Sequence, residues 1–324
     1  MRKSPRTASP TTPRIHRAEH SLVVAAPASV VYDLIANAAS WPAVFGPCVH
    51  VRHLDHNPRA ERFEIWADVN GRVAQWTSRR TLDPERRYVA FRQEHGSPPV
   101  ASMSGGWLLR ELPDGHTEVV LRHRFTIVDH DPTAAAEVSR ALDRNSAAEL
   151  GALARIAEVG PATGGLVLTF SDTIALACPA EEAYEFVNRA DLWAERLPHV
   201  ARTELTETVP GIQELEMDTV TADGSAHTTR SIRVCSRPGW IAYKQRTPPK
   251  LLLGHSGLWT FDDAGTGAVA SARHTVVIDP EAVPAVLGAD ATLADARTYI
   301  RRALGDNSRA TLALAAGLPG TVPR

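Results

Sequence analysis

Apolar and polar residues alternate along several stretches of the chain, with the period of two that is typical of half-buried β-strands. Asn70-Gly71 lies between two such stretches, and this pair favours a type I′ turn because both of its positions require a positive φ. One face of the predicted hairpin is apolar and must be buried, yet it carries Arg80. The turn also sets the register, so that these residues face each other: Glu61 and Arg80, Phe63 and Ser78, Ile65 and Trp76, Ala67 and Ala74.

The same alternation predicts strands over 88–93, 103–111 and 119–127, and in the last of them His123 points inward among apolar side chains. A long helix is predicted after Asp131-Pro132. Its apolar residues have helical spacing, and Asn145 lies near the same face as Val138, Leu142, Leu153 and Ile156. An antiparallel sheet that buries one face against one long helix curls around it. We therefore expect an α+β fold with an interior cavity.

The second half of the chain repeats the first in the same order. The repeated features are a strand, a proline, a short helix and a tryptophan, then a set of strands and a final helix. The matching pairs are Trp41 and Trp193, Phe91 and Tyr243, Trp107 and Trp259, His123 and His274, Asn145 and Asn307. A period of a whole domain indicates a tandem duplication. We expect a disordered tail over 1–17, an N-terminal domain over 18–160, a linker rich in Gly and Pro, and a C-terminal domain over 166–318.

The hairpin of the second half has two possible registers. A two-residue turn at Asp223-Gly224 points Arg230 inward, whereas counting from Gly224 by analogy with the first half points Ser231 and Arg233 inward. Either register places a threonine where the first half has Trp76. We therefore expect the chemistry in the first half and a degenerate or accessory pocket in the second.

Bulk properties exclude several classes of function. The chain has 324 residues, which favours two domains, and its formal charge of −2 gives no electrostatic basis for nucleic-acid binding. The apolar runs are too short for a membrane span, and the first 17 residues lack the apolar core of a signal peptide. Three widely spaced cysteines indicate neither a disulfide framework nor a metal site. We expect a cytoplasmic protein that binds neither membrane nor metal.

Four features carry a resemblance to a known family. They are Pro27-x-x-x-Val31, Trp41-Pro42-x-x-Phe45, the strand Arg72-Val73-x-x-Trp76-x-Ser78-x-Arg80, and Trp107. With this order of elements, the chain resembles the aromatase/cyclases of bacterial type II polyketide synthases, and above all their di-domain members. The resemblance implies two tandem helix-grip domains, as in START and Bet v 1-like proteins, each a curved antiparallel sheet around a long C-terminal helix.

The family function implied by the resemblance is first-ring aldol cyclisation of a poly-β-ketone, followed by dehydration to an aromatic ring. The substrate would be tethered to an acyl carrier protein and already reduced at one ketone. Other subunits of the synthase would be further partners. No cofactor is implied, and we expect a monomer or weak dimer. Ring regiospecificity, chain length and the final metabolite stay open.

We expect Arg80 to stabilise the enolate, because a guanidinium presents planar donors to oxygens that gain charge. Since arginine does not exchange protons at neutral pH, His123 is the expected acid and base. Cys48 stands where single-domain relatives have a tyrosine, which leaves the general acid unidentified. The expected substrate-binding residues are Trp41, Phe45, Trp66, Trp76, Ser78, Gln93, Met103, Trp107 and Asn145. Those of the second pocket are Trp193, Ser231, Arg233, Tyr243, Trp259 and His274.

Each assignment has a structural alternative. Arg80 can form an ion pair with Glu61, His123 can be a hydrogen-bonded core residue, the tryptophans can be ordinary packing, and Asn145 can bond to a strand. The helix-grip fold also occurs in proteins that only bind lipids, pigments or other apolar molecules. A third possibility is a structural subunit of the synthase, which predicts an occluded cavity.

Overall fold

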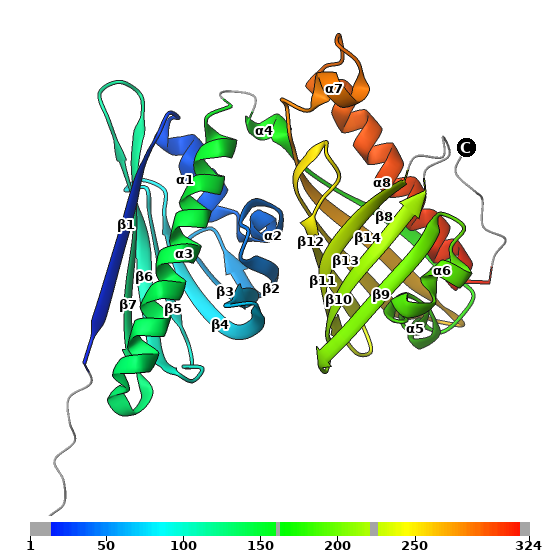
Figure 1. The fold of residues 1–324 in the computed structure, drawn as a ribbon, viewed down its shortest axis with the longest axis horizontal. Coiled ribbons are helices and arrows are strands. Elements are labelled where there is room, and N and C mark those ends of the chain that lie inside the picture. The colour runs from blue at the N-terminus through cyan, green and yellow to red at the C-terminus, as the bar shows by residue number, and fades with distance from the viewer. Residues whose placement is uncertain (1–13, 160–162, 221–225, 318–324) are drawn as a thin grey trace, which may run out of the picture.

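Each half of the chain forms a seven-stranded antiparallel sheet with one long helix across it (Figure 1). The computed structural model describes residues 14–159, 163–220 and 226–317. The strand order is β1-β7-β6-β5-β4-β3-β2 in the first sheet and β8-β14-β13-β12-β11-β10-β9 in the second. The expected α+β fold with two tandem helix-grip domains is thereby confirmed.

The N-terminal domain runs from the first strand to the first long helix. Its strands are β1 (His16–Val24), β2 (Cys48–Asn57), β3 (Ala60–Val69), β4 (Arg72–Asp83), β5 (Tyr88–Gln93), β6 (Val100–Glu111) and β7 (Thr117–Ile127). Its helices are α1 (Ala28–Ala36), α2 (Trp41–Val44) and α3 (Pro132–Ala157), with short 3₁₀ turns η1 (Ala38–Ser40) and η2 (Val128–His130).

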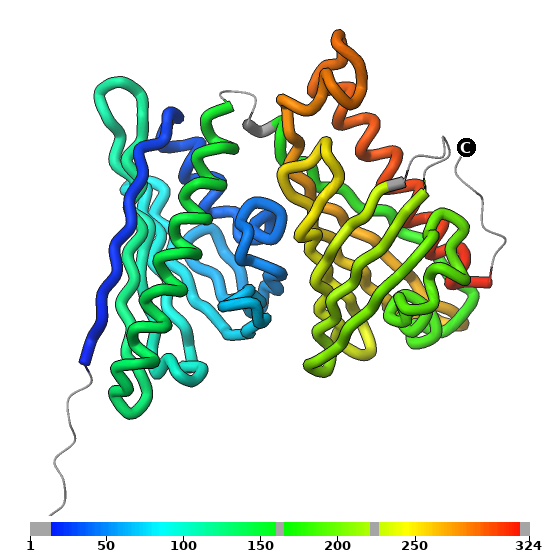
Figure 2. The backbone as a smooth tube through the Cα atoms, viewed as in Figure 1, coloured from blue at the N-terminus to red at the C-terminus, as the bar shows by residue number. Residues whose placement is uncertain are grey.

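The C-terminal domain repeats this order, as the smooth backbone trace makes plain (Figure 2). Its strands are β8 (Val167–Leu176), β9 (Val200–Val209), β10 (Ile212–Val220), β11 (Ala226–Ser236), β12 (Trp240–Thr247), β13 (Leu252–Ala264) and β14 (Gly267–Ile278). Its helices are α5 (Ala180–Asn188), α6 (Trp193–Arg196), α7 (Val283–Leu287) and α8 (Leu293–Ala315), with η3 (Ala190–Leu192) and a short α4 (Thr163–Leu166) at its start.

Local sequence explains the first hairpin and the long helices. Asn70 and Gly71 have φ values of 56° and 79°, as a type I′ turn requires, and all four predicted pairs of β3 and β4 face each other. The side chain of Asp131 accepts a hydrogen bond from the Thr133 amide at the start of α3. A capping box that includes Thr292 begins α8.

The register of the second hairpin settles which arginine points inward. Thr219 pairs with His227 and Gln213 with Arg233, so the connection differs by one residue from a two-residue turn at Asp223-Gly224. Residues 221–225, where that turn was expected, lie outside the described residues. Because side chains alternate along a strand, Arg233 is buried and Arg230 lies on the other face, paired with Glu216.

The ends of the domains differ slightly from the expected bounds. Strand β1 begins at His16, two residues inside the segment expected to be a tail. Residues 1–13, and residues 160–162 of the expected linker, lie outside the described residues, and α4 occupies the linker's last residues. Within the part of the chain that the structure describes, no helix has the length and apolar character needed to cross a membrane.

The two domains pack against each other through the outer face of the second sheet. Helix α2 of the first domain contacts β13 of the second, on the side that faces the second domain in Figure 1. An apolar cluster joins the outer faces of the two sheets, with members on β2, β3, β11 and β12: Val49, Trp66, Ile232, Val234 and Ala242.

Candidate active site

A cavity of about 350 Å³ lies in the N-terminal domain between the concave face of the sheet and α3. This volume is within the range of small-molecule sites. The side chains at one end are exposed, among them Asn70, Ser97 and Glu137, so this end is the mouth. The other end is enclosed, and the cavity brings together most of the predicted residues: Trp41, Trp76, Ser78, Arg80, Gln93, Met103, Trp107, His123 and Asn145.

Two predicted substrate-binding residues do not line this cavity. Phe45 is buried behind the wall and stacks on Trp107, with ring centroids 6.2 Å apart. Trp66 is on the outward face of β3, where it packs against His50 of its own domain and Trp240 of the second domain. The period of two explains the error for Trp66, because its neighbour Ile65 takes the inward position.

Arg80 lies at the enclosed end, and the protein already occupies most of its donors. Its guanidinium forms the ion pair with Glu61 that the sequence left as the alternative role, and both side chains are buried. The Nη1 and Nη2 groups also donate to the carbonyl oxygens of Ile35 (2.9 Å) and Ala36 (2.7 Å) at the end of α1. Trp41 covers the guanidinium, with its ring centroid 4.4 Å from Cζ. Few of the five N–H groups are left for a ligand.

The charge of Arg80 is balanced inside the domain. Burial raises the pKa of the Glu61 carboxyl, but hydrogen bonds from His53 and Arg80 outweigh this effect and hold the pKa below its usual value. Glu61 is therefore ionised at neutral pH. The pair anchors α1 to β3 and β4 and closes the inner end of the cavity.

His123 differs from an ordinary core histidine because neither ring nitrogen has a hydrogen-bond partner among the described residues. Its Nδ1 is buried and unpartnered, and so is Oε1 of Gln93, which lines the same cavity. Burial lowers the pKa of His123 to about 4, so the imidazole is neutral at pH 7. Buried polar atoms normally have partners, so these two atoms are available to hydrogen-bond water or a polar ligand in the cavity.

Glu149 is a functional candidate that the sequence reasoning missed. It lies on the cavity side of α3, one turn after Asn145, and burial raises the pKa of its carboxyl to about 7. The signal was present in the sequence, because Glu149 is seven residues after Leu142 and four before Leu153 on the predicted apolar face. A carboxyl with a pKa near neutrality in a cavity is typical of a general acid or base.

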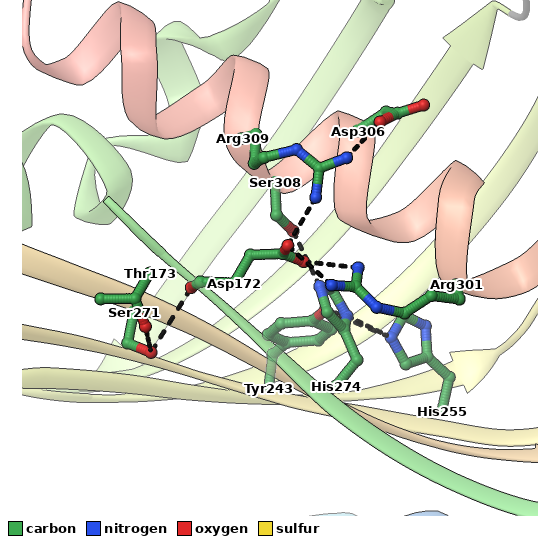
Figure 3. Close-up of polar contacts among 10 residues, drawn as sticks. All are labelled: Asp172, Thr173, Tyr243, His255, Ser271, His274, Arg301, Asp306, Ser308 and Arg309. Atoms are coloured by element: carbon green, nitrogen blue, oxygen red, sulfur yellow. Dashed lines mark hydrogen bonds and ion pairs between the residues drawn. The ribbon is translucent and has the colours of Figure 1, made fainter. Parts of the chain in front are cut away.

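The second domain carries a hydrogen-bonded network at the equivalent place (Figure 3). Nδ1 of His274 lies 3.1 Å from both the Tyr243 hydroxyl and Nε2 of His255, and its Nε2 lies 2.8 Å from Oγ of Ser308. Burial lowers the pKa of His274 to about 4 and raises that of the Tyr243 hydroxyl. Both ring nitrogens of His274 are thus occupied.

Two substitutions between the halves account for the loss of partners at Nδ1. Tyr243 and His255 of the second domain occupy the positions of Phe91 and Met103 in the first, so the polar partners of the histidine are replaced by apolar side chains. His123 contacts Phe91 edge-on, with ring centroids 5.4 Å apart. The histidine is therefore free for a ligand in the first domain and engaged in the second.

Arg233 repeats the arrangement of Arg80. It donates to the Val187 carbonyl (2.6 Å) at the end of α5 and to Oε1 of Gln213 (2.6 Å), and Trp193 lies 5.2 Å from its Cζ. The arginine therefore has an anchoring role in both domains. Of the other residues expected in the second pocket, Trp259 is buried and Ser231 is partly buried on the inner face of β11.

Comparison with known proteins identifies the family. Residues 24–148 match the family model "Polyketide cyclase / dehydrase and lipid transport". The chain is 60% identical to the granaticin polyketide synthase bifunctional cyclase/dehydratase of Streptomyces violaceoruber over 306 residues, which cover 94% of each chain. The chain belongs to the polyketide cyclase/dehydratase family. It is also 50% identical to the actinorhodin polyketide synthase bifunctional cyclase/dehydratase of Streptomyces coelicolor, over 95% of this chain and 98% of that one.

Solved structures agree with this family assignment. The di-domain ARO/CYC BexL from the BE-7585A biosynthetic pathway is 45% identical, with a TM-score of 0.78 over 95% of this chain and 100% of that one. The di-domain ARO/CYC StfQ from the steffimycin biosynthetic pathway is 38% identical, with a TM-score of 0.76 over 93% and 97%. The predicted resemblance to the di-domain aromatase/cyclases, and the predicted enzyme class, are confirmed.

Proposed function

We propose that this polyketide aromatase/cyclase closes the first ring of a poly-β-ketone in the N-terminal cavity and dehydrates it to an aromatic ring. The observation that carries the proposal is the convergence of Glu149, the unpartnered His123 and the unpartnered Gln93 in one mostly apolar cavity. From the family resemblance we also propose that the chain is reduced at one ketone before it enters.

Ring closure needs a base for a methylene proton, and we assign this step to the Glu149 carboxylate. The methylene between two carbonyls loses a proton to Glu149, the enolate carbon attacks a more distant carbonyl of the chain, and a C–C bond forms. The protonated Glu149 returns its proton to the new alkoxide, which becomes a hydroxyl. In dehydration the Glu149 carboxylate removes a proton from the neighbouring carbon, the C–O bond breaks, and the carboxyl gives this proton to the departing hydroxyl, which leaves as water. The hydroxyl that the earlier ketone reduction placed in the ring leaves by the same steps, and loss of this second water completes the aromatic ring. A group with a pKa near 7 serves both as base and as acid in this sequence.

His123 holds the reacting oxygen in this proposal. With a pKa of about 4 it is a weak base, which changes the role expected from the sequence. A neutral imidazole still donates one N–H, and it stabilises a carbonyl oxygen that gains negative charge without giving up its proton. Gln93 lines the same cavity, and its unpartnered Oε1 offers an acceptor for a hydroxyl or enol of the chain.

Arg80 serves mainly as the anchor of the enclosed end. Its pairing with Glu61 and with two carbonyls leaves little donor capacity for an enolate. Trp41, Trp76 and Trp107 form broad faces against which a flexible chain bends.

We further propose that an acyl carrier protein delivers the tethered chain at the exposed mouth, near Asn70, Ser97 and Glu137. The relatives named above are parts of polyketide synthases, which supports other synthase subunits as partners. A cytoplasmic location fits the three free cysteines.

The deciding experiment supplies the protein with a carrier-bound poly-β-ketone from a reconstituted synthase and analyses the products. If the protein is an enzyme, adding it shifts the product mixture toward a single product that contains the aromatic first ring, and Glu149→Gln removes this shift. The alternative, a binding protein for apolar molecules, retains the chain or a product analogue without changing it. A product spectrum that is the same with and without the protein would overturn the proposal.

A further inference from the structure

One lysine of the second domain contacts the cavity wall of the first. Lys244 on β12 is a buried residue, 8% exposed, and its side chain points away from the interior of its own domain. Its ammonium group donates to the carbonyl oxygens of Pro42 (2.6 Å) and Phe45 (2.9 Å). Among the described residues it forms no ion pair with a carboxylate. A buried ammonium without a counter-ion is costly unless hydrogen bonds replace its hydration, and the two carbonyls take this role for Lys244.

The two carbonyls belong to the end of α2. A helix leaves its last carbonyl groups without partners inside the helix, and α2 has only four residues. Lys244 satisfies the Pro42 carbonyl and shares the Phe45 carbonyl with the Cys48 amide, which lies 3.2 Å from it. The lysine therefore holds both the helix and the residues that follow it.

A second residue of the C-terminal domain, Gly254, lies close to the same helix. At Gly254 of β13, a Cβ atom would lie only 1.9 Å from the Ala43 carbonyl oxygen, so a larger residue does not fit unless α2 moves. Lys244 and Gly254 together approach the carbonyl groups of three residues of one turn, Pro42, Ala43 and Phe45. Such a close approach of two backbones requires glycine.

This turn of the chain forms the cavity wall of the first domain. Trp41 and Cys48, on either side of it, line the cavity, and Phe45 within it stacks on Trp107. Trp41 also covers the Arg80 guanidinium. A movement of α2 therefore changes the shape of the enclosed end.

We infer that Lys244 is a positioning residue for the cavity of the first domain, and that Gly254 assists it. Through these two contacts the second domain holds α2 in position. The inference rests on the proposed function only for its effect on catalysis. The inference assigns the second domain a structural role that does not require a catalytic site in that domain. At neutral pH the ammonium is mostly charged, because burial lowers the pKa of Lys244 only to about 8.

The test measures amide hydrogen exchange in peptides that span residues 41–48 of the full chain, without substrate. Lys244→Met, which keeps the length of the side chain but removes its donors, is expected to speed this exchange about tenfold relative to the wild type. Lys250→Met is the matched control, since this exposed lysine lies in the next turn. Exchange in residues 41–48 that equals the control, or that rises equally throughout both domains, would overturn the inference.

Gly254→Ala tests the same wall if Lys244→Met does not fold. Its Cβ would overlap the Ala43 carbonyl oxygen, so it displaces α2 and is expected to speed exchange in the same peptides. In the assay with substrate, both variants are expected to raise KM or change the product ratio more than they lower kcat. Faster local exchange with unchanged KM and products would refute the effect on the cavity. Because exchange needs no reaction, it is measured even if the proposed function is wrong.

Discussion

Arg80 and Glu61 form a buried ion pair directly across β4 and β3, in the register that the Asn70-Gly71 turn sets. Removing one partner of such a pair leaves an uncompensated charge. We expect Arg80→Ala to lower the free energy of unfolding by about 3–5 kcal/mol. Denaturant unfolding measures this loss.

Two variants separate anchoring by Arg80 from donation to an enolate. Arg79→Ala, whose guanidinium is exposed and pairs with Glu94, is expected to change stability little. The double variant Arg80→Met/Glu61→Leu removes both charges and is expected to recover stability. If it folds and also cyclises normally, Arg80 acts only as an anchor. If it folds but is inactive, the arginine is a donor to the reacting oxygen after all.

The two histidines at matching positions are expected to respond oppositely to substitution. His123→Leu removes an unpartnered N–H from the cavity and is expected to slow the reaction by roughly 10²–10³-fold, with little loss of stability. His274→Leu breaks a buried network and is expected to lower stability by about 1–3 kcal/mol. Single-turnover kinetics and thermal unfolding distinguish the two. A large loss of stability with His123→Leu would make this histidine structural.

Much of the first domain was predictable because local chemistry determines it. A type I′ turn sets the pairs of β3 and β4, and side-chain alternation then places Trp76, Ser78 and Arg80 on the inner face. The second hairpin was ambiguous, since one extra residue in a connection turns every side chain to the other face. That shift decides between Arg230 and Arg233.

What covers an outward face does not follow from periodicity. We expected Trp66 to bind substrate, although the hairpin register pairs it with Gln75 on the outer face. Its burial against Trp240 depends on how the two domains meet. Lys244 carries no local pattern at all, because its partners lie about two hundred residues away in the sequence. The position of Glu149, by contrast, could have been predicted, because its spacing from Leu142 and Leu153 places it on the apolar face of the helix.

The location of Trp66 outside the cavity predicts a contrast with Trp76 on the neighbouring strand. Trp76→Ala is expected to weaken binding of an aromatic product analogue, because Trp76 lines the cavity. Trp66→Ala is expected to leave this affinity unchanged but to lower the free energy of unfolding by about 3–5 kcal/mol, since Trp66 is only 6% exposed. Titration calorimetry and denaturant unfolding check both effects. If Trp66→Ala weakens binding without a loss of stability, Trp66 contacts the ligand and this prediction is wrong.

Glu149 makes the sharpest prediction for pH dependence. Its pKa in the folded state, about 7, lies above the ordinary carboxyl value of 4.5, so the folded protein binds more protons than the unfolded chain between these values. The contribution of Glu149 to stability is therefore fully present below about pH 4.5 and is lost as the pH rises through 7. Glu149→Gln cannot ionise, so we expect it to be more stable than the wild type at pH 8 and no more stable at pH 4.

The same substitution tests catalysis. If Glu149 takes the methylene proton, kcat/KM of the wild type rises with pH around 7, and Glu149→Gln loses both this dependence and most of the rate. Glu111→Gln, an exposed carboxylate outside the cavity, is expected to change neither. His123→Gln keeps an N–H donor, so it is expected to retain part of the rate and the same pH dependence. A profile near pH 7 that persists in Glu149→Gln but disappears in His123→Gln would transfer the proton step to the histidine.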